Sequence, residues 1–168
     1  MRRFAPTALL AAALLAVTSA AVAAPPPVRP DFTPEPILAG QGCNFKLGVV
    51  GTDAKARVKT FKNGREIISG KGFQLTYTNL DTGKSVTFPT NGTSQTTSAP
   101  VKDVVTVTAT GSNGLILFPS DVSTVEGVAA PSAIQYTGRI VYTVNVKTGL
   151  FTLISASGKQ RDLCAELS

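Results

Sequence analysis

Alternation of apolar and polar residues is the feature that most limits how this chain can fold. From Cys43 onward apolar residues recur at every second position, for example at Phe45, Leu47 and Val49. A period of two places side chains on alternate faces of a strand, whereas a helix requires a period of about 3.6. The runs are rich in Val, Ile, Thr and aromatic residues, which suit a half-buried pleated surface. The sequence therefore predicts an all-β chain, and it predicts no helix.

Short turn signals separate these runs. Each contains a glycine that can take the positive φ a hairpin needs. The signals are Asn63-Gly64, Asp81-Thr82-Gly83, Asn113-Gly114, Lys147-Thr148-Gly149 and Ser157-Gly158. Between the turn signals the sequence predicts about ten short strands, near residues 44–50, 56–62, 65–69, 73–79, 84–89, 94–98, 103–110, 114–118, 134–146 and 150–156. Strands at this spacing predict a single antiparallel β-sandwich. A closed β-barrel is the alternative, because periodicity does not distinguish the two.

The first 23 residues predict a signal peptide that is removed on export. Met1-Arg2-Arg3 is a short basic start, residues 5–17 are apolar and uncharged, and Ala21-Val22-Ala23 is a cleavage signal. The apolar run is too short for a membrane span, which needs about 20 residues. We therefore expect a secreted, extracellular protein whose mature chain carries no membrane anchor.

Residues 24–42 predict a Pro-rich linker. Six of the eleven prolines lie between Pro25 and Pro36, and such a segment favours polyproline II, which buries little surface. The remaining residues, 43–168, have the length of one domain, which is enough for a proper core. Three segments are therefore predicted: a signal peptide (1–23), a linker (24–42) and an all-β domain (43–168).

The chain contains two cysteines, one at each end of the predicted domain. Cys43 opens the first strand, and Cys164 lies four residues from the end of the chain. Exported proteins fold in an oxidising compartment, where two such cysteines pair. We therefore predict a Cys43–Cys164 disulfide that ties the ends of the domain together.

The composition excludes much of enzyme chemistry. The sequence has no histidine, which removes Ser-His-Asp and Cys-His nucleophiles and the most frequent general base. Two distant cysteines without histidine do not build a zinc site, and no Gly-rich phosphate loop follows a strand. Three enzyme routes stay open: a carboxylate pair such as Asp121 and Glu126, a Ser-Lys dyad, and a calcium site at Asp81-Thr82 or Asp121. The sequence predicts a non-catalytic domain with no metal and no cofactor.

The charge of the chain is moderately basic. Removing the signal peptide takes away two arginines and leaves 14 basic and 10 acidic side chains, a net charge of +4. This is not a nucleic-acid signature. Lys55, Arg57 and Lys59 share one face of a predicted strand, with Lys62 and Arg65 just beyond. This stripe predicts a charged sheet edge that resists edge-to-edge pairing, and a site for anionic polymers is the alternative.

One connection is unusually long. Pro119–Ala133 has two prolines and no strand pattern, and such connections are uncommon in compact domains and often functional. The segment predicts either a crossover between the two sheets or a binding loop. Phe118, Pro119 and Asp121, at its start, are the candidate residues for binding a ligand or partner.

Three segments carry a resemblance to known proteins. Tyr77-Thr78-Asn79-Leu80-Asp81-Thr82-Gly83, Leu115-Ile116-Leu117-Phe118-Pro119-Ser120-Asp121 and Asp162-Leu163-Cys164-Ala165 resemble small exported all-β proteins of high-GC Gram-positive bacteria. The resemblance covers most of the mature domain. It implies a secreted bacterial β-domain, and it implies no activity and no functional residues.

The sequence as a whole predicts a secreted non-catalytic β-domain that binds a partner at the cell surface or in the medium. The partner is unknown, with a cell-wall or other extracellular macromolecule as one candidate and nucleic acid not expected. The alternative is a small-molecule carrier with an interior apolar cavity, a barrel whose inward positions include Phe73, Leu75, Tyr77 and Tyr142. A carboxylate enzyme and a protease inhibitor presenting the long loop are further alternatives. An interior cavity distinguishes a carrier from a solid sandwich.

Overall fold

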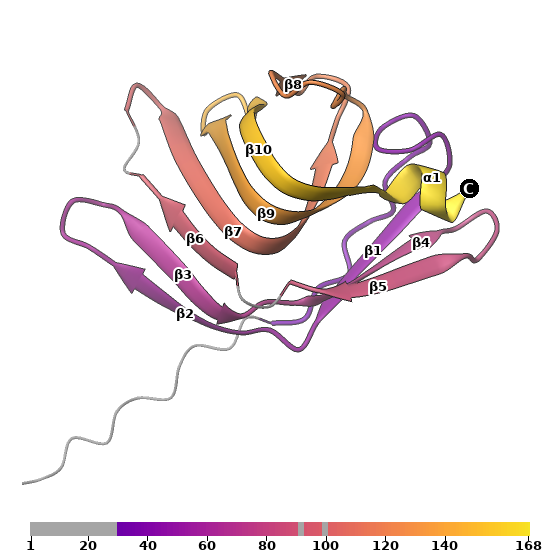
Figure 1. Cartoon of the computed structure of the whole chain (residues 1–168), viewed down its shortest axis with the longest axis horizontal. Coiled ribbons are helices and arrows are strands. Elements are labelled where there is room, and N and C mark those ends of the chain that lie inside the picture. The colour runs from indigo at the N-terminus through magenta and orange to yellow at the C-terminus, as the bar shows by residue number, and fades with distance from the viewer. Residues whose placement is uncertain (1–29, 91–92, 99–100) are drawn as a thin grey trace, which may run out of the picture.

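The computed structural model describes residues 30–90, 93–98 and 101–168 and shows two β-sheets packed together (Figure 1). One sheet has three strands and the other seven, and neither of them closes into a barrel. The predicted β-sandwich is therefore confirmed. The predicted signal peptide and the first six residues of the predicted linker lie outside the described residues.

Ten strands and one short helix make up the described part of the chain. They are β1 (Leu47–Thr52), β2 (Lys55–Thr60), β3 (Glu66–Lys71), β4 (Gln74–Asn79), β5 (Ser85–Pro89), β6 (Thr93–Thr97), β7 (Val104–Leu117), β8 (Val122–Ser123), β9 (Ser132–Asn145), β10 (Phe151–Asp162) and α1 (Leu163–Leu167). The small sheet has the order β1-β4-β5, and the large sheet has the order β2-β3-β6-β7-β9-β10-β8. Neighbouring strands are antiparallel except β8 and β10, which are parallel.

A line of glycines bends the large sheet. Gly111 of β7 pairs with Gly138 of β9, and Gly138 also pairs with Gly158 of β10. All three have positive φ, which other residues rarely adopt. The three strands curve together into a U (Figure 1). The predicted turns at Asn113-Gly114 and Ser157-Gly158 are therefore wrong, because both pairs lie inside long strands that glycine bends without ending them.

One hydrophobic core packs against the curved large sheet. Its buried members are Ala109, Leu115, Leu117, Val128, Ile134, Tyr136, Ile140 and Leu153. The long connection between β7 and β9 supplies Val128 and also packs Val125 and Ala130 against this core. Because β7 and β9 are neighbours in one sheet, the predicted crossover between sheets is wrong. The connection instead runs to the far side of β10, pairs there as β8, and returns over this core.

The second core lies between the small sheet and the large sheet. Its buried members are Cys43, Phe45, Leu47, Val49, Leu75, Tyr77, Phe88, Ala133, Leu163 and Leu167. The last two belong to α1, so the prediction of no helix is wrong for the end of the chain. Five residues are too few to show a helical period. The helix begins where the side chain of Asp162 accepts a hydrogen bond from the backbone of Ala165 at 3.0 Å.

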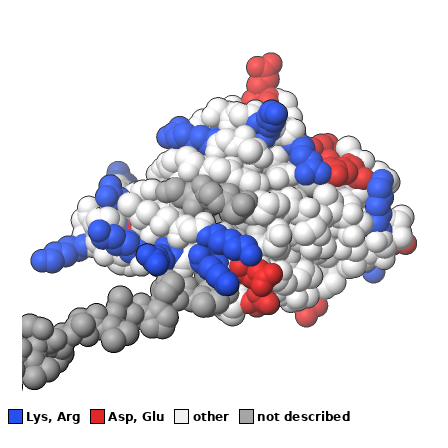
Figure 2. All heavy atoms as spheres, turned by 60° about the horizontal axis from the view of Figure 1, so that its bottom comes forward, with Lys and Arg blue, Asp and Glu red and all other residues white. Residues whose placement is uncertain are grey.

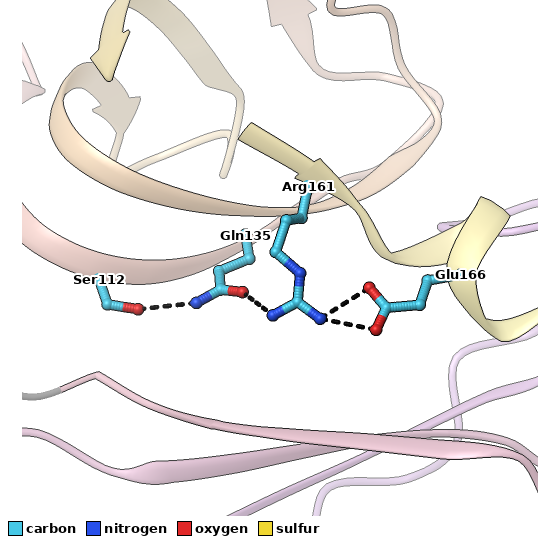
Figure 3. Close-up of polar contacts among 4 residues, drawn as sticks. All are labelled: Ser112, Gln135, Arg161 and Glu166. Atoms are coloured by element: carbon cyan, nitrogen blue, oxygen red, sulfur yellow. Dashed lines mark hydrogen bonds and ion pairs between the residues drawn. The ribbon is translucent and has the colours of Figure 1, made fainter. Parts of the chain in front are cut away.

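A disulfide and a polar chain hold α1 in place. The predicted Cys43–Cys164 bond is present. Arg161 places Nη2 at 2.6 and 2.8 Å from the two carboxylate oxygens of Glu166, and its Nη1 donates to Oε1 of Gln135 at 2.6 Å. Gln135 is buried and donates from Nε2 to Oγ of Ser112 at 2.9 Å. Figure 3 shows these four side chains in a row between the two sheets, linking α1 to β7 and β9.

Two hairpins share one turn structure. In Asn79-Leu80-Asp81-Thr82-Gly83, the Oδ1 atom of Asn79 accepts from the second and third following backbone N–H groups. Asn145-Val146-Lys147-Thr148-Gly149 repeats the same contacts, and Gly83 and Gly149 both have positive φ. These two predicted turns are therefore confirmed, because asparagine and glycine fix them locally.

Part of the predicted linker packs on the small sheet. Phe32 pairs with Gly51, and Ile37 pairs with Leu47, through isolated bridges. The Phe32 ring meets the Phe73 ring edge-on, with centroids 4.9 Å apart. A Cβ at Gly51 would overlap the Phe32 ring, so glycine is required for this contact.

Tyr77 makes the core sensitive to alkaline pH. Its side chain is 2% exposed and stacks on Phe88, and burial raises its pKa to about 12 from 10.0. Folding favours the protonated phenol. The contribution of this group to the free energy of unfolding is therefore complete below pH 10 and is lost as the pH rises to 12. We expect the free energy of unfolding to fall by about 2–3 kcal/mol over this range through Tyr77. Urea unfolding of the wild type and Tyr77→Phe measures this term as the difference between their pH profiles, and identical profiles would contradict it.

Candidate functional site

The principal candidate site is a partly open cavity where the two sheets meet. Its volume is about 250 Å³. β6 pairs with residues 107–110 of β7, whereas beyond the bend β7 approaches the small sheet at Gly114. The cavity lies where β7 stops pairing with β6 and begins to contact the small sheet. The large sheet, β4 and the connections on either side of β4 and β5 all contribute to its lining.

The lining is apolar with a few neutral polar groups. The residues are Ala56, Ile68, Ser69, Gly70, Gly72, Phe73, Leu75, Thr90, Gln95, Ala109, Asn113, Gly114, Leu115, Ile140, Tyr142 and Phe151. None of them carries a charge. An uncharged lining of this kind favours a neutral and mostly apolar occupant, because burying an unpaired charge costs far more than burying an apolar group.

Two close backbone approaches shape the wall. A Cβ at Gly114 would overlap the hydroxyl of Tyr77, and a Cβ at Gly72 would overlap the backbone of Thr90. Glycine at position 114 therefore lets Tyr77 of the small sheet approach β7, and glycine at position 72 lets the segment before β4 approach Thr90. The backbone N–H of Thr90 also donates to the carbonyl of Phe73 at 2.8 Å, which holds this part of the wall together.

A polar pair marks one side of the cavity. Nε2 of Gln95 donates to the hydroxyl of Tyr142 at 3.2 Å, and the ring of Tyr142 stacks on Phe151 with centroids 4.7 Å apart. Burial raises the pKa of Tyr142, so the phenol stays protonated at neutral pH. Because the hydroxyl accepts from Gln95, its own hydrogen is directed elsewhere and can be donated to a ligand.

The residues predicted for partner binding lie in a separate turn. Phe118 and Pro119 are exposed, Phe118 to 41%. Oδ2 of Asp121 accepts from the backbone N–H of Phe118 at 2.7 Å, and Oδ1 accepts from the N–H of Phe151 at 3.4 Å. The carboxylate of Asp121 thus holds its own turn against the start of β10. Phe118 and Pro119 are the members of this prediction that present free surface.

The sequence identified part of the cavity wall. Of the four residues expected to point inward in a carrier, Phe73, Leu75 and Tyr142 line the cavity, whereas Tyr77 is packed in the adjacent core. Gln95 was missed. It lies in a short stretch rich in Thr and Ser, where no local pattern distinguishes a glutamine that meets a distant tyrosine.

The described residues contain neither a cluster of metal ligands nor a membrane-spanning helix. Among them, no three His, Cys, Asp or Glu side chains gather closely enough to hold a metal ion. In the same part of the chain, no helix has both the length and the apolar character needed to cross a membrane.

The chain was also compared with known proteins. No protein-family model, no curated protein and no solved structure matches it. The class of the protein therefore comes from its own fold and cavity: a disulfide-closed β-sandwich with an uncharged cavity at the junction of its sheets.

Proposed function

We propose that this chain is an exported, non-catalytic binding domain that takes a neutral, mostly apolar small molecule into the cavity between its sheets. The observation that carries the proposal is the cavity itself, with its uncharged lining and the Gln95–Tyr142 pair. Among the functions expected from the sequence, this favours the small-molecule carrier over the solid sandwich that binds only through its surface.

The size of the cavity supports a ligand of one or two rings. An apolar cavity of about 150 Å³ accepts benzene, and this one is larger at about 250 Å³. It lies just below the range of ordinary ligand sites, which begins at about 300 Å³. A compact neutral molecule therefore fits better than a long lipid chain.

The polar pair gives the ligand an orientation. Tyr142 offers a hydrogen-bond donor at one wall, whereas Ile140 and Leu115 offer only apolar surface. A ligand with one carbonyl or ether oxygen and an otherwise apolar body can accept the Tyr142 hydrogen bond and also pack against the apolar wall. Such a site binds its ligand without altering it, since no charged side chain belongs to the lining.

Export is part of the proposal. The predicted signal peptide at 1–23 and the Cys43–Cys164 disulfide support folding in an oxidising compartment. The denatured mass of the protein from its native culture medium should correspond to cleavage after Ala23 and to a deficit of two hydrogens. The native mass should exceed the denatured mass by the mass of one small molecule. Equal masses, together with failure of the titration described next, would reject the carrier function.

Replacement of Tyr142 by phenylalanine should weaken binding without emptying the site. The neutral naphthyl ketone prodan is a suitable probe, because its fluorescence reports an apolar environment and its carbonyl can accept from the Tyr142 hydroxyl. We expect Tyr142→Phe to raise the Kd for prodan about fivefold, the equivalent of one hydrogen bond of about 1 kcal/mol. Fluorescence titration measures this change.

The matched control is Tyr136→Phe. Tyr136 also lies on β9 and is buried, but it is outside the cavity lining, and its hydroxyl donates to Gln160 at 3.1 Å. We expect this variant to bind prodan like the wild type. An equal loss of affinity in both variants would show that stability, not the Tyr142 hydroxyl, controls binding. Binding that also survives Ala109→Leu, which fills the cavity, would place the probe elsewhere.

A further inference from the structure

The positive charge of the chain is concentrated in one hairpin. Residues 55–71, which form β2, its turn and β3, contain six Lys or Arg and a single acid, Glu66. The whole chain has 16 basic and 10 acidic residues, so ten basic and nine acidic residues lie elsewhere. The hairpin therefore carries +5 of the formal charge of +6. Figure 2 shows the Lys and Arg side chains crowded at the end of the molecule where this hairpin lies.

The cations lie on the side of the hairpin that faces away from the cavity. Lys55, Arg57 and Lys59 occupy alternate positions of β2 and are exposed, whereas Ala56 between them is buried and lines the cavity. Successive cations on such a face lie about 7 Å apart. Lys71 is the direct cross-strand partner of Lys55, so the charged face extends onto β3.

Arg65 and Lys62 are two further cations, in the turn at the end of the hairpin. Nζ of Lys59 lies 5.0 Å from the centre of the Phe61 ring, and the guanidinium carbon of Arg65 lies 4.6 Å from it. Lys62 is exposed beside them. The aromatic ring thus holds two cations together that would otherwise repel each other.

These cations are not neutralised within the described part of the chain. The two ion pairs found there are Lys147–Asp103 and Arg161–Glu166, and neither involves the hairpin. Opposed like charges such as Lys55 and Lys71 destabilise a strand pair. A few charges on the edge strand β2 are enough to prevent it from pairing with the edge of another sheet. In this hairpin the positive charges also continue into β3 and the turn. This excess indicates an external anionic partner.

We propose that the outer face of the β2–β3 hairpin binds a linear polymer that carries closely spaced phosphate groups. Arginine, here Arg57 and Arg65, suits phosphate because its guanidinium donates two parallel hydrogen bonds. Each exposed contact is weak by itself, so a polymer that meets several cations in succession gains most. A lipid surface is less suitable, because Phe61 is the single aromatic residue of the hairpin and is half-buried beneath Lys59 and Arg65.

Binding to sodium polyphosphate tests this proposal on the full protein purified from the medium. We expect the logarithm of the association constant to fall with the logarithm of salt concentration with a slope of about −3 to −4, as for five contacts. The triple variant Lys55→Gln, Arg57→Gln and Lys59→Gln should weaken binding at least about tenfold and reduce the slope by about 2.

A second triple variant controls for net charge. It removes one Arg and two Lys from exposed positions outside the hairpin: Lys46→Gln, Arg139→Gln and Lys159→Gln. We expect this variant to bind polyphosphate within about twofold of the wild type, because it leaves the hairpin contacts intact. Equal losses in both variants would overturn the proposal in favour of a general charge effect. Tighter binding to phosphatidylglycerol vesicles than to polyphosphate would overturn it in favour of a membrane surface.

Discussion

Replacing Cys43 and Cys164 with serine is expected to lower the free energy of unfolding by about 4–5 kcal/mol. The disulfide joins residues 121 apart in the sequence, and a cross-link over such a distance removes much of the entropy of the unfolded chain. The bond joins the first strand region to α1, so it restricts almost the whole domain. Urea unfolding of the double variant and the wild type measures the difference.

Two controls separate the cross-link from the side chains. Cys43 is 4% exposed and belongs to the core, so serine there also buries a hydroxyl. The Cys43→Ala/Cys164→Ala variant avoids that hydroxyl, and reduced wild-type protein breaks the bond without any substitution. We expect all three to lose similar stability. A loss below about 1 kcal/mol in the reduced protein would mean that Leu163, Leu167 and the Arg161–Glu166 pair hold the end of the chain without the bond.

Features that depend on neighbouring residues were predictable from the sequence. The turns at Asp81-Thr82-Gly83 and Lys147-Thr148-Gly149 are fixed by an asparagine and a glycine a few residues apart. The alternation in β1 and β4 places one residue in two in the core, so their burial follows from the pattern alone. The disulfide was predictable because the chain has only two cysteines.

Features that depend on distant residues were not predictable. Gly111, Gly138 and Gly158 are far apart in the sequence, and only the register of β7, β9 and β10 places them in one line. Read locally, Ser157-Gly158 is a turn signal, whereas in the sheet it bends a continuous strand. The same reason conceals Gln95, whose partner Tyr142 is 47 residues away. The cavity is therefore a consequence of the register and of the bend, and neither has a local signature.

Replacing Gly138 with alanine is expected to lower the free energy of unfolding by about 3 kcal/mol or more. Gly138 has φ +153°, and a Cβ there would overlap the carbonyl oxygen of Ser157 and lie 2.9 Å from Cα of Gly158. Both obstacles are backbone atoms of β10, which cannot rotate away as a side chain can. The cost combines an unfavourable φ of about 1–3 kcal/mol with a steric overlap at the centre of the sheet.

Gly149→Ala is the matched control for Gly138→Ala. Gly149 also has positive φ, +74°, but a Cβ there would have nothing within 4 Å. Gly149→Ala should lower the free energy of unfolding by about 1–2 kcal/mol, which is the cost of the left-handed conformation alone. The difference between the two variants in urea unfolding therefore measures the overlap at the bend, and equal losses would show that the close approach of β9 and β10 is not essential.

The bend also connects stability to the proposed binding site. Ile140 and Tyr142 lie two and four residues beyond Gly138 on β9, and both line the cavity. If alanine at Gly138 forces β9 away from β10, these two side chains move relative to Leu75 and Phe73 on the opposite wall. We therefore expect Gly138→Ala to weaken prodan binding in the fraction of protein that remains folded, whereas Gly149→Ala should not. Unchanged prodan affinity in folded Gly138→Ala would mean that the cavity does not depend on the glycine line, and that the bend serves only the packing of β9 against β10.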